Sequence, residues 1–456
     1  MPGEMCAIMG PSGAGKTSLL NILAQRKNAE DYSGSVYYNG ILGKLSPHGY
    51  VTQQDVHIAE LTVRETLDIA SELRLPEGMS KVEKHKRVEH VLEMLLLMNV
   101  ADDVVGGPFT QGISGGEMKR LSIGVELLHF PDLMFLDEPT TGLDSSTSLE
   151  VVSALRNLAN QRRTIIATIH QPSQDMFCLF DKILLLADSR VLYFGETSNC
   201  CEFYAQSPYQ FKCPDAVDPS EFIMSIAGSA LPAVDGRTIS AGELAILYAT
   251  SPQCAAVTER INTLEKSYNV AQSPSSSRSS TTETFSSVHV NAEPHLSLKH
   301  QLEVLLHRRY LVFIRTWKMH VWTSMKEILA AIIIGTIWLQ IGTGNAEHVY
   351  TDRFSVLNKT LIYMTVRNLN PMAVFEDRLI YYRERTLNAY SPFAYWVSVW
   401  LPQVPLTVVN GIIYGAVVYP LAGLRAGGQY VMTYLYFITT GEIAIYFLFN
   451  MVTALC

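Results

Sequence analysis

The sequence predicts an α/β domain with a mostly parallel sheet, followed by an all-α domain that spans a membrane. In the first half of the chain, short apolar runs alternate with helical patterns, as a parallel sheet with crossover helices requires. The last third instead holds long apolar stretches, each long enough for the roughly 20 residues that cross a bilayer. The overall hydrophobic content of 48% averages over these two parts. A chain of 456 residues is long enough for two or three domains, about 150 residues being typical of one.

The elements of the predicted sheet are short and apolar, as strands buried on both faces are. The first run, 5–9, is followed by a glycine-rich loop and then by a helical pattern, TSLLNILAQR. Further strands are predicted at 133–136, 164–169, 183–187 and 191–194, and helices at 64–75, 81–98, 118–129 and 145–160.

The second domain begins with a helical pattern over 296–317 whose apolar and basic sides suit a helix lying flat at a membrane surface; an ordinary packed helix is the alternative. Four spans are predicted after it, at 321–342, 354–375, 393–421 and 429–455. The second has the weakest pattern because it holds Lys359 and Arg367.

Charge in the connecting segments predicts the orientation of the spans. The segment 376–390 contains Arg378, Arg383 and Arg385, whereas 343–353 has a single arginine beside two acids. Arginine-rich loops stay in the cytoplasm. We therefore expect 376–390 on the cytosolic side. The N-terminus has no signal-peptide pattern, so the first domain is expected there as well.

These patterns divide the chain into three parts: an α/β domain at 1–228, a linker at 229–295 and a membrane domain at 296–456. The linker contains a Ser/Thr-rich stretch at 271–287, whose composition is typical of disorder. The net charge of −8 argues against general nucleic-acid binding, which needs a basic face. The seven cysteines form no metal-binding spacing, and we expect reduced cytosolic thiols.

The most specific motif is a phosphate-binding loop that fits G-x-x-x-x-G-K-[ST] in full. It lies between a predicted strand and a predicted helix, where glycines let backbone N–H groups surround phosphate oxygens. The Lys16 ammonium is expected to reach the β- and γ-phosphates, and the Thr17 hydroxyl to ligate Mg²⁺. The predicted ATP-binding residues here are Gly10, Pro11, Ser12, Gly13, Ala14, Gly15, Lys16, Thr17 and Ser18.

Two further motifs lie downstream. The apolar strand 133–136 ends at Asp137, which can hold Mg²⁺, and the adjacent Glu138 can polarise an attacking water. The second motif, which precedes a predicted helix, is an anion site or simply a helix N-cap. It consists of Ser114, Gly115, Gly116 and Glu117.

Taken together, the phosphate loop, the Asp-Glu pair and the Ser-Gly-Gly-Glu motif resemble those of the ABC ATPases, a P-loop NTPase family. The resemblance implies roles for further residues. Gln53 in YVTQQD, or alternatively Gln54, resembles the glutamine that ligates Mg²⁺ and senses the membrane domain. Asp144 resembles the aspartate of the D-loop, and His170 the switch histidine that contacts the γ-phosphate. The catalytic set implied is thus Glu138, His170 and Gln53, with Thr17, Gln53 and Asp137 around the metal.

The order of the domains is typical of the G subfamily of ABC transporters, which includes the white and pleiotropic drug resistance types. The segments SGGEMKR, IHQPS and YYRERTLNAYSPFAYW also resemble that group. The resemblance implies a multi-pass membrane protein that hydrolyses ATP and exports a lipophilic or amphipathic substrate. It also implies a second ABC half as partner, with ATP sites shared across a head-to-tail interface.

Two departures from the family pattern are expected to matter. The family has strands upstream of the phosphate loop, including an aromatic residue that stacks on adenine, and its membrane domain has six spans. Here Gly10 is preceded by only nine residues, and four spans are predicted. Truncation at both ends is therefore one interpretation. The alternative function is then a non-transporting protein that binds ATP or a partner.

Overall fold

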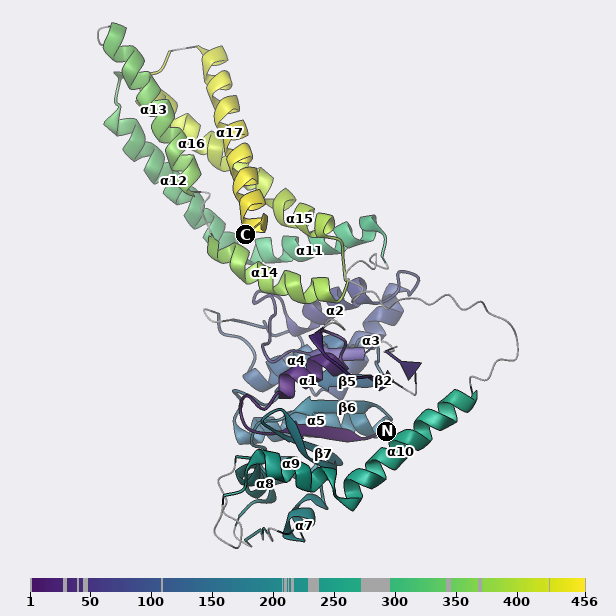
Figure 1. Cartoon of the computed structure of the whole chain (residues 1–456). Helices are drawn as coiled ribbons and strands as arrows, with labels where there is room; N and C mark the ends of the chain where they lie inside the picture. Colours follow the sequence, from purple (N-terminus) through teal and green to yellow (C-terminus); the bar gives the residue numbers. More distant parts are fainter. Residues whose placement is uncertain are drawn as a thin grey trace.

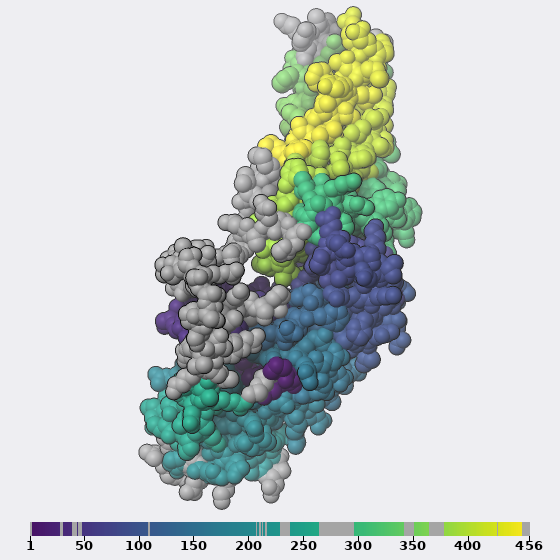
Figure 2. Space-filling view, turned by 90° about the vertical axis from the view of Figure 1, so that its right-hand side faces the viewer, coloured from purple at the N-terminus to yellow at the C-terminus, as the bar shows by residue number. Residues whose placement is uncertain are grey.

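The computed structural model contains two parts, an α/β domain and an elongated helical domain that stands on it (Figure 1). A view turned by 90° presents the same arrangement (Figure 2). The structure describes residues 2–455, except for 28–30, 39–40, 44–47, 108–109, 207, 209–210, 212, 215–216, 229–237, 272–295, 342–345, 368–370 and 426. The Ser/Thr-rich stretch at 271–287 thus lies almost entirely outside the described residues.

The sheet of the first domain has six strands in the order β4-β5-β6-β1-β7-β8. All neighbours are parallel except β7 and β8, which form an antiparallel pair. Since β1 pairs in parallel with β6 on one side and with β7 on the other, its carboxyl end lies in the middle of the sheet, beside the carboxyl ends of these neighbours. The strands are β1 Met5–Met9, β4 His48–Val51, β5 Leu133–Leu136, β6 Thr164–Thr168, β7 Lys182–Ala187 and β8 Arg190–Glu196.

Helices cover the sheet and bury one large apolar core. The predicted helices are all present, with ends that differ by a few residues. The helices of this domain are α1 Lys16–Leu23, α2 Val63–Arg74, α3 Lys81–Met94, α4 Gly115–Leu127, α5 Ser145–Asn160, α6 Gln174–Cys178, α7 Cys200–Ala205, α8 Pro219–Ala227, α9 Ala241–Ala249 and α10 Pro252–Ala271, of which the first five were predicted. A small second sheet pairs β2 Tyr37–Tyr38 with β3 Ile41–Leu42.

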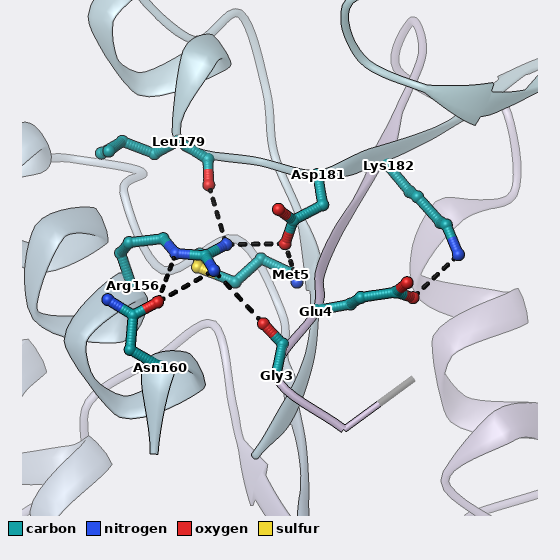
Figure 3. Close-up of polar contacts among 8 residues, drawn as sticks. All are labelled: Gly3, Glu4, Met5, Arg156, Asn160, Leu179, Asp181 and Lys182. Carbon is teal, nitrogen blue, oxygen red and sulfur yellow. Dashed lines mark hydrogen bonds and ion pairs between the residues drawn. The ribbon is translucent and has the colours of Figure 1, made fainter. Parts of the chain in front are cut away.

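The start of the central strand is fixed by polar contacts to its neighbours (Figure 3). Arg156 on α5 donates to Asp181 Oδ2 at 2.6 Å and to the Gly3 carbonyl at 3.3 Å. The same carboxylate oxygen accepts from the Met5 backbone N–H at 2.7 Å. These bonds tie the start of β1 to α5 and to the segment before β7.

The first domain extends further along the chain than its predicted end at residue 228. Helix α9 packs on β8, and its residues Leu244 and Tyr248 are buried in the main core. The Tyr248 hydroxyl also donates to the Phe194 carbonyl at 3.1 Å. The sequence predicts a linker here, because a single short helix has too few turns to show a clear hydrophobic periodicity.

The second domain contains the helices α11 Leu298–Arg315, α12 Trp317–Ile337, α13 Ala346–Arg367, α14 Pro371–Thr386, α15 Pro392–Trp400, α16 Val404–Leu421 and α17 Gly428–Leu455. Within the described residues, three segments are long and apolar enough to cross a membrane: Trp317–Ile337, Pro392–Leu421 and Gly428–Leu448. They coincide with the first, third and fourth predicted spans.

The second predicted span, 354–375, differs from the structure. Helix α13 ends at Arg367 and a separate helix, α14, begins at Pro371. The side chains of 346–350 and 364–377 lie outside the part of the chain that the structure describes, so 354–375 as a membrane span stays a prediction. The segment 376–390, predicted as a loop, is largely the helix α14, which lies between the domains (Figure 1).

The two domains meet through α2 on one side and α11 and α14 on the other. Leu61, Ile69 and Leu73 share one apolar cluster with Val304 and Leu305 of α11. Part of the apolar face of α11 therefore packs against protein, while Leu298, Tyr310 and Ile314 of the same helix are exposed.

Candidate active site

The phosphate-binding loop joins the buried strand β1 to the helix α1. Its glycines have positive φ angles, +150° at Gly10, +83° at Gly13 and +93° at Gly15, which side-chain-bearing residues rarely adopt. A Cβ atom at Gly10 would come within 2.0 Å of the Leu186 carbonyl oxygen. The sequence GPSGAGKT thus forms a tight turn whose backbone N–H groups precede a helix N-terminus, an arrangement that favours anions.

The Lys16 side chain lies against this loop. It is buried, and its ammonium donates to the carbonyls of Gly10 at 2.8 Å and Pro11 at 3.1 Å. Burial lowers the pKa of Lys16, while Glu138 and Asp137 nearby act in the opposite direction. The ammonium is therefore positioned at the loop, where phosphate oxygens can replace the two carbonyl acceptors.

A chain of hydrogen bonds joins the loop to the Asp-Glu pair. The hydroxyls of Thr17 and Thr168 both donate to Asp137 Oδ1, at 3.0 and 2.9 Å. The Glu138 N–H donates to the Thr168 hydroxyl at 2.7 Å. Asp137 is only 5% exposed, so these bonds hold a buried carboxylate in one orientation.

The oxygens of Thr17 and Asp137 are hard donors that fit Mg²⁺. This ion usually takes one or two protein ligands and completes its shell with phosphates and water. No cluster of three or more His, Cys, Asp or Glu side chains with metal-binding geometry occurs within the described residues.

Glu138 lies at the strand end with a φ of +46°. Its Oε2 atom accepts from Gln53 Nε2 at 2.7 Å and from the Thr141 hydroxyl at 3.0 Å. By contrast, the backbone carbonyl of Gln54 accepts a hydrogen bond from the Thr52 hydroxyl at 2.9 Å. Of the two glutamines left open by the sequence, Gln53 is thus the one that contacts the Asp-Glu pair.

The Ser-Gly-Gly-Glu motif lies apart from the phosphate loop. Ser114 is the N-cap of α4, and it forms a reciprocal capping box with Glu117. A Cβ at Gly116 would overlap Thr147 of α5, so the two helix starts are in close contact. Asp144 caps α5, and its hydrogen bonds with Ser146 and Thr147 hold its pKa below its usual range.

His170 follows β6 and is partly buried. Across the residues that the structure describes, no hydrogen bond joins His170, Ser114 or Asp144 to the phosphate loop or to Glu138. The structure therefore brings together Lys16, Thr17, Gln53, Asp137 and Glu138, and leaves the other predicted residues outside this group.

Three residues at the site were not identified from the sequence. Thr168 and Thr141 contact the Asp-Glu pair, as described above. Lys119 of α4 donates to the Gln53 carbonyl at 2.9 Å and pairs with Asp55 at 2.9 Å, with its side chain 2% exposed. Its place in SGGEMKR, three residues beyond Gly116, was the available signal. A lysine on a helix is usually exposed, so the pattern gave no reason to single it out.

Comparisons with known proteins agree with this geometry. The "ABC transporter" family matches residues 1–141, and the "ABC-2 type transporter" family matches residues 300–456. The chain is 33% identical over 447 residues to ABC transporter G family member 11 of Arabidopsis thaliana, covering 96% of this chain and 62% of the relative. It is 33% identical over 436 residues to ABC transporter G family member 1 of Petunia hybrida, covering 94% and 66%.

A third relative, a broad substrate specificity ATP-binding cassette transporter of Rattus norvegicus, is 45% identical over 223 residues, covering 48% of this chain and 34% of the relative. The chain combines an ATP-binding cassette with an ABC-2 type membrane domain, the two domains of an ABC transporter. Within that class, it belongs to the G family. It spans about two thirds of the length of the Arabidopsis and Petunia relatives.

Proposed function

We propose that this chain is the ATP-hydrolysing subunit of a G-type ABC exporter that moves a lipophilic or amphipathic substrate across a membrane. The observation that carries the proposal is the chain of hydrogen bonds through Thr17, Asp137, Thr168, Glu138 and Gln53, beside the Lys16 ammonium at the phosphate loop. It places phosphate-binding, metal-binding and water-activating side chains together at the carboxyl ends of the strands.

In this proposal each residue has one task. The Lys16 ammonium neutralises phosphate charge, and the oxygens of Thr17, Asp137 and Gln53 hold Mg²⁺, which when bound neutralises the charge that develops on the phosphates. The Glu138 carboxylate accepts a proton from, or orients, the attacking water. Gln53 already contacts Glu138, so a change at the nucleotide site can move Gln53 and the segment that follows it.

That segment leads directly to the membrane domain. The carbonyl of Val56 accepts a hydrogen bond from Arg383 of α14, and the carbonyl of Glu60 accepts one from Arg315 of α11 at 2.6 Å. Arg315 also forms two bonds to Glu65, at 2.6 and 2.7 Å. A movement of Gln53 would therefore reach α11 and α14 through fewer than ten residues, which supports coupling between ATP turnover and the spans.

The same contacts support a cytosolic ATP-binding domain. Helix α14 carries the arginines Arg378, Arg383 and Arg385 and lies on the side of the membrane domain that faces the first domain. Basic segments favour the cytosolic side. The bilayer, a lipophilic substrate and a second ABC half are thus the proposed partners.

We further propose that Ser114 and Asp144 act on the nucleotide of a second ABC half, with His170 acting at the γ-phosphate. A two-fold pair would bury two nucleotides, each between the phosphate loop of one chain and the Ser-Gly-Gly-Glu motif of the other. In a homodimer, Ser114→Arg should abolish hydrolysis. A mixed pair of Lys16→Ala and Ser114→Arg chains should keep at most one intact site. Full ATPase activity in strictly monomeric protein would refute this assembly.

The test of hydrolysis uses Glu138→Gln in the chain reconstituted in vesicles. ATP binding should persist, while turnover falls on the order of a hundredfold or more because the water-activating carboxylate is lost. Lys16→Ala should weaken binding itself. Glu93→Gln on α3 should behave as wild type, because the Glu93 side chain is exposed and forms no ion pair among the described residues. Normal turnover by Glu138→Gln would contradict the assignment. ATP hydrolysis without substrate movement would favour the non-transporting alternative.

A further inference from the structure

The interface between the two domains contains a small cavity with an unusual lining. It lies among α2, α11 and α14, and its volume is about 40 Å³. By the same measure a single water needs about 10–15 Å³, so the cavity can hold a small ligand. Its polar lining consists of His57, Thr66, Arg74, Arg308, Arg383 and Glu384, and the remaining lining residues are aliphatic.

The charges around the cavity do not balance. Arg74 forms two bonds to Glu126, at 3.0 and 2.9 Å, and both side chains are nearly buried. Arg308, only 2% exposed, forms two bonds to Glu384, at 2.8 and 3.0 Å.

The third guanidinium, Arg383, donates to the Val56 carbonyl and forms no ion pair within the described part of the chain. Burial lowers the pKa of Arg383, an effect only partly opposed by Glu384 and Glu126. Both of those carboxylates already have an arginine of their own. Among the side chains that the structure describes, three guanidinium groups therefore face two carboxylates, which leaves one excess positive charge.

The cavity also gathers hydrogen-bond donors without acceptors. The Nε atoms of Arg308 and Arg383 are buried and have no hydrogen-bond partner among the described residues. The same holds for His57 Nδ1, while His57 Nε2 lies 2.7 Å from the Ser122 hydroxyl. Burial, with the charges of Arg383 and Lys119, lowers the pKa of His57 well below its usual range, so the ring is neutral. When Ser122 donates to Nε2, Nδ1 carries the proton and is a third free donor.

These features point to an anion. A buried donor without an acceptor is destabilising, so groups of such donors normally have a water or an ion as partner. A water molecule would accept from these donors but would leave the excess charge in place. None of the described lining side chains offers an unpartnered oxygen to bind a cation or to accept from a water.

We propose that this cavity binds one small monovalent anion, with chloride as its abundant natural occupant. The anion accepts from the Nε–H groups of Arg308 and Arg383 and from His57, and it neutralises the excess charge. It thereby stabilises the contact between α14 and the segment that follows Gln53. The site is distinct from the nucleotide site and does not depend on the proposed transport function.

The test measures thermal unfolding of the purified full chain in detergent, with chloride replaced stepwise by gluconate at constant ionic strength. We expect the melting temperature to rise with chloride and to saturate. The rise should be lost in Arg383→Gln, which removes the excess charge. It should persist in Arg385→Gln, which alters a neighbouring arginine on the same helix that does not line the cavity.

An independent measurement needs no variant. Crystals or cryo-EM samples prepared in bromide should place an anion in the cavity, and in crystals an anomalous peak should mark it. A melting temperature that is the same in chloride and gluconate would overturn the proposal, as would the same chloride dependence in Arg383→Gln. Density for water alone in the bromide sample would overturn it as well.

Discussion

The Thr168 hydroxyl is the contact on which the orientation of the Asp-Glu pair depends. It donates to Asp137 Oδ1 and accepts from the Glu138 N–H, and the residue is fully buried. Thr168→Val keeps the shape of the side chain and removes both bonds. Thr168→Ser keeps the hydroxyl and removes only a methyl group. The two variants therefore separate the polar contribution from packing.

The expected magnitudes follow from these contacts. Removing a donor to a charged acceptor costs about 1.5–3 kcal/mol, and an orphaned buried N–H costs about 1–3 kcal/mol. Together we expect Thr168→Val to lower the free energy of unfolding by about 2.5–6 kcal/mol. For a domain of this size each kcal/mol shifts the melting temperature by about 2–4 °C, so the shift is about 5–24 °C. Loss of one methyl in Thr168→Ser should cost about 0.5–1.5 kcal/mol.

The assay is thermal unfolding of the ATP-binding domain in the full chain, followed by ATP hydrolysis below the melting temperature. Thr168→Val should also hydrolyse ATP more slowly, because Glu138 loses the bond that fixes its backbone at a positive φ. Thr168→Ser should remain close to wild type in rate. If Thr168→Val has the same melting temperature as Thr168→Ser and hydrolyses ATP equally fast, the hydroxyl does not orient the Asp-Glu pair and the reasoning fails.

Two further predictions concern buried charges. Glu126→Gln should lower the free energy of unfolding by about 3–5 kcal/mol because it leaves the Arg74 guanidinium buried and unpaired. The exposed control Glu93→Gln should change the free energy of unfolding by about 0.5 kcal/mol or less. Burial raises the pKa of Glu126, but Arg74 outweighs this and keeps the pKa below its ordinary value. Its stabilisation is therefore present above about pH 4.3 and lost as the pH falls below that, so the difference between wild type and Glu126→Gln should shrink in acid. Lys119→Met should lower the ATPase rate without abolishing ATP binding, since it releases the carbonyl of Gln53; an unchanged steady-state rate would show that this contact does not position the glutamine.

Much of the first domain could be predicted because its signals are local. The phosphate loop needs glycines at defined positions of positive φ, and the Asp-Glu pair must follow a buried strand. Both are patterns within a few adjacent residues. The second domain was harder, because hydropathy alone cannot tell a membrane span from a helix with one polar side. Helices α13 and α14 illustrate this. From its apolar pattern with a few charges, the sequence predicts a weak span followed by a loop, whereas the structure has two separate helices.

The sequence by itself determined the class of site, the residues of the phosphate loop, the Asp-Glu pair and the order of the two domains. Only the tertiary structure decided which glutamine contacts Glu138, and that Thr168 and Lys119 support the site. These contacts join residues between 30 and 85 positions apart in the chain, and no periodicity records them. The same holds for the three arginines at the domain interface. Each is an ordinary charged residue in the sequence, and their shared cavity arises only when α11 and α14 pack against α2.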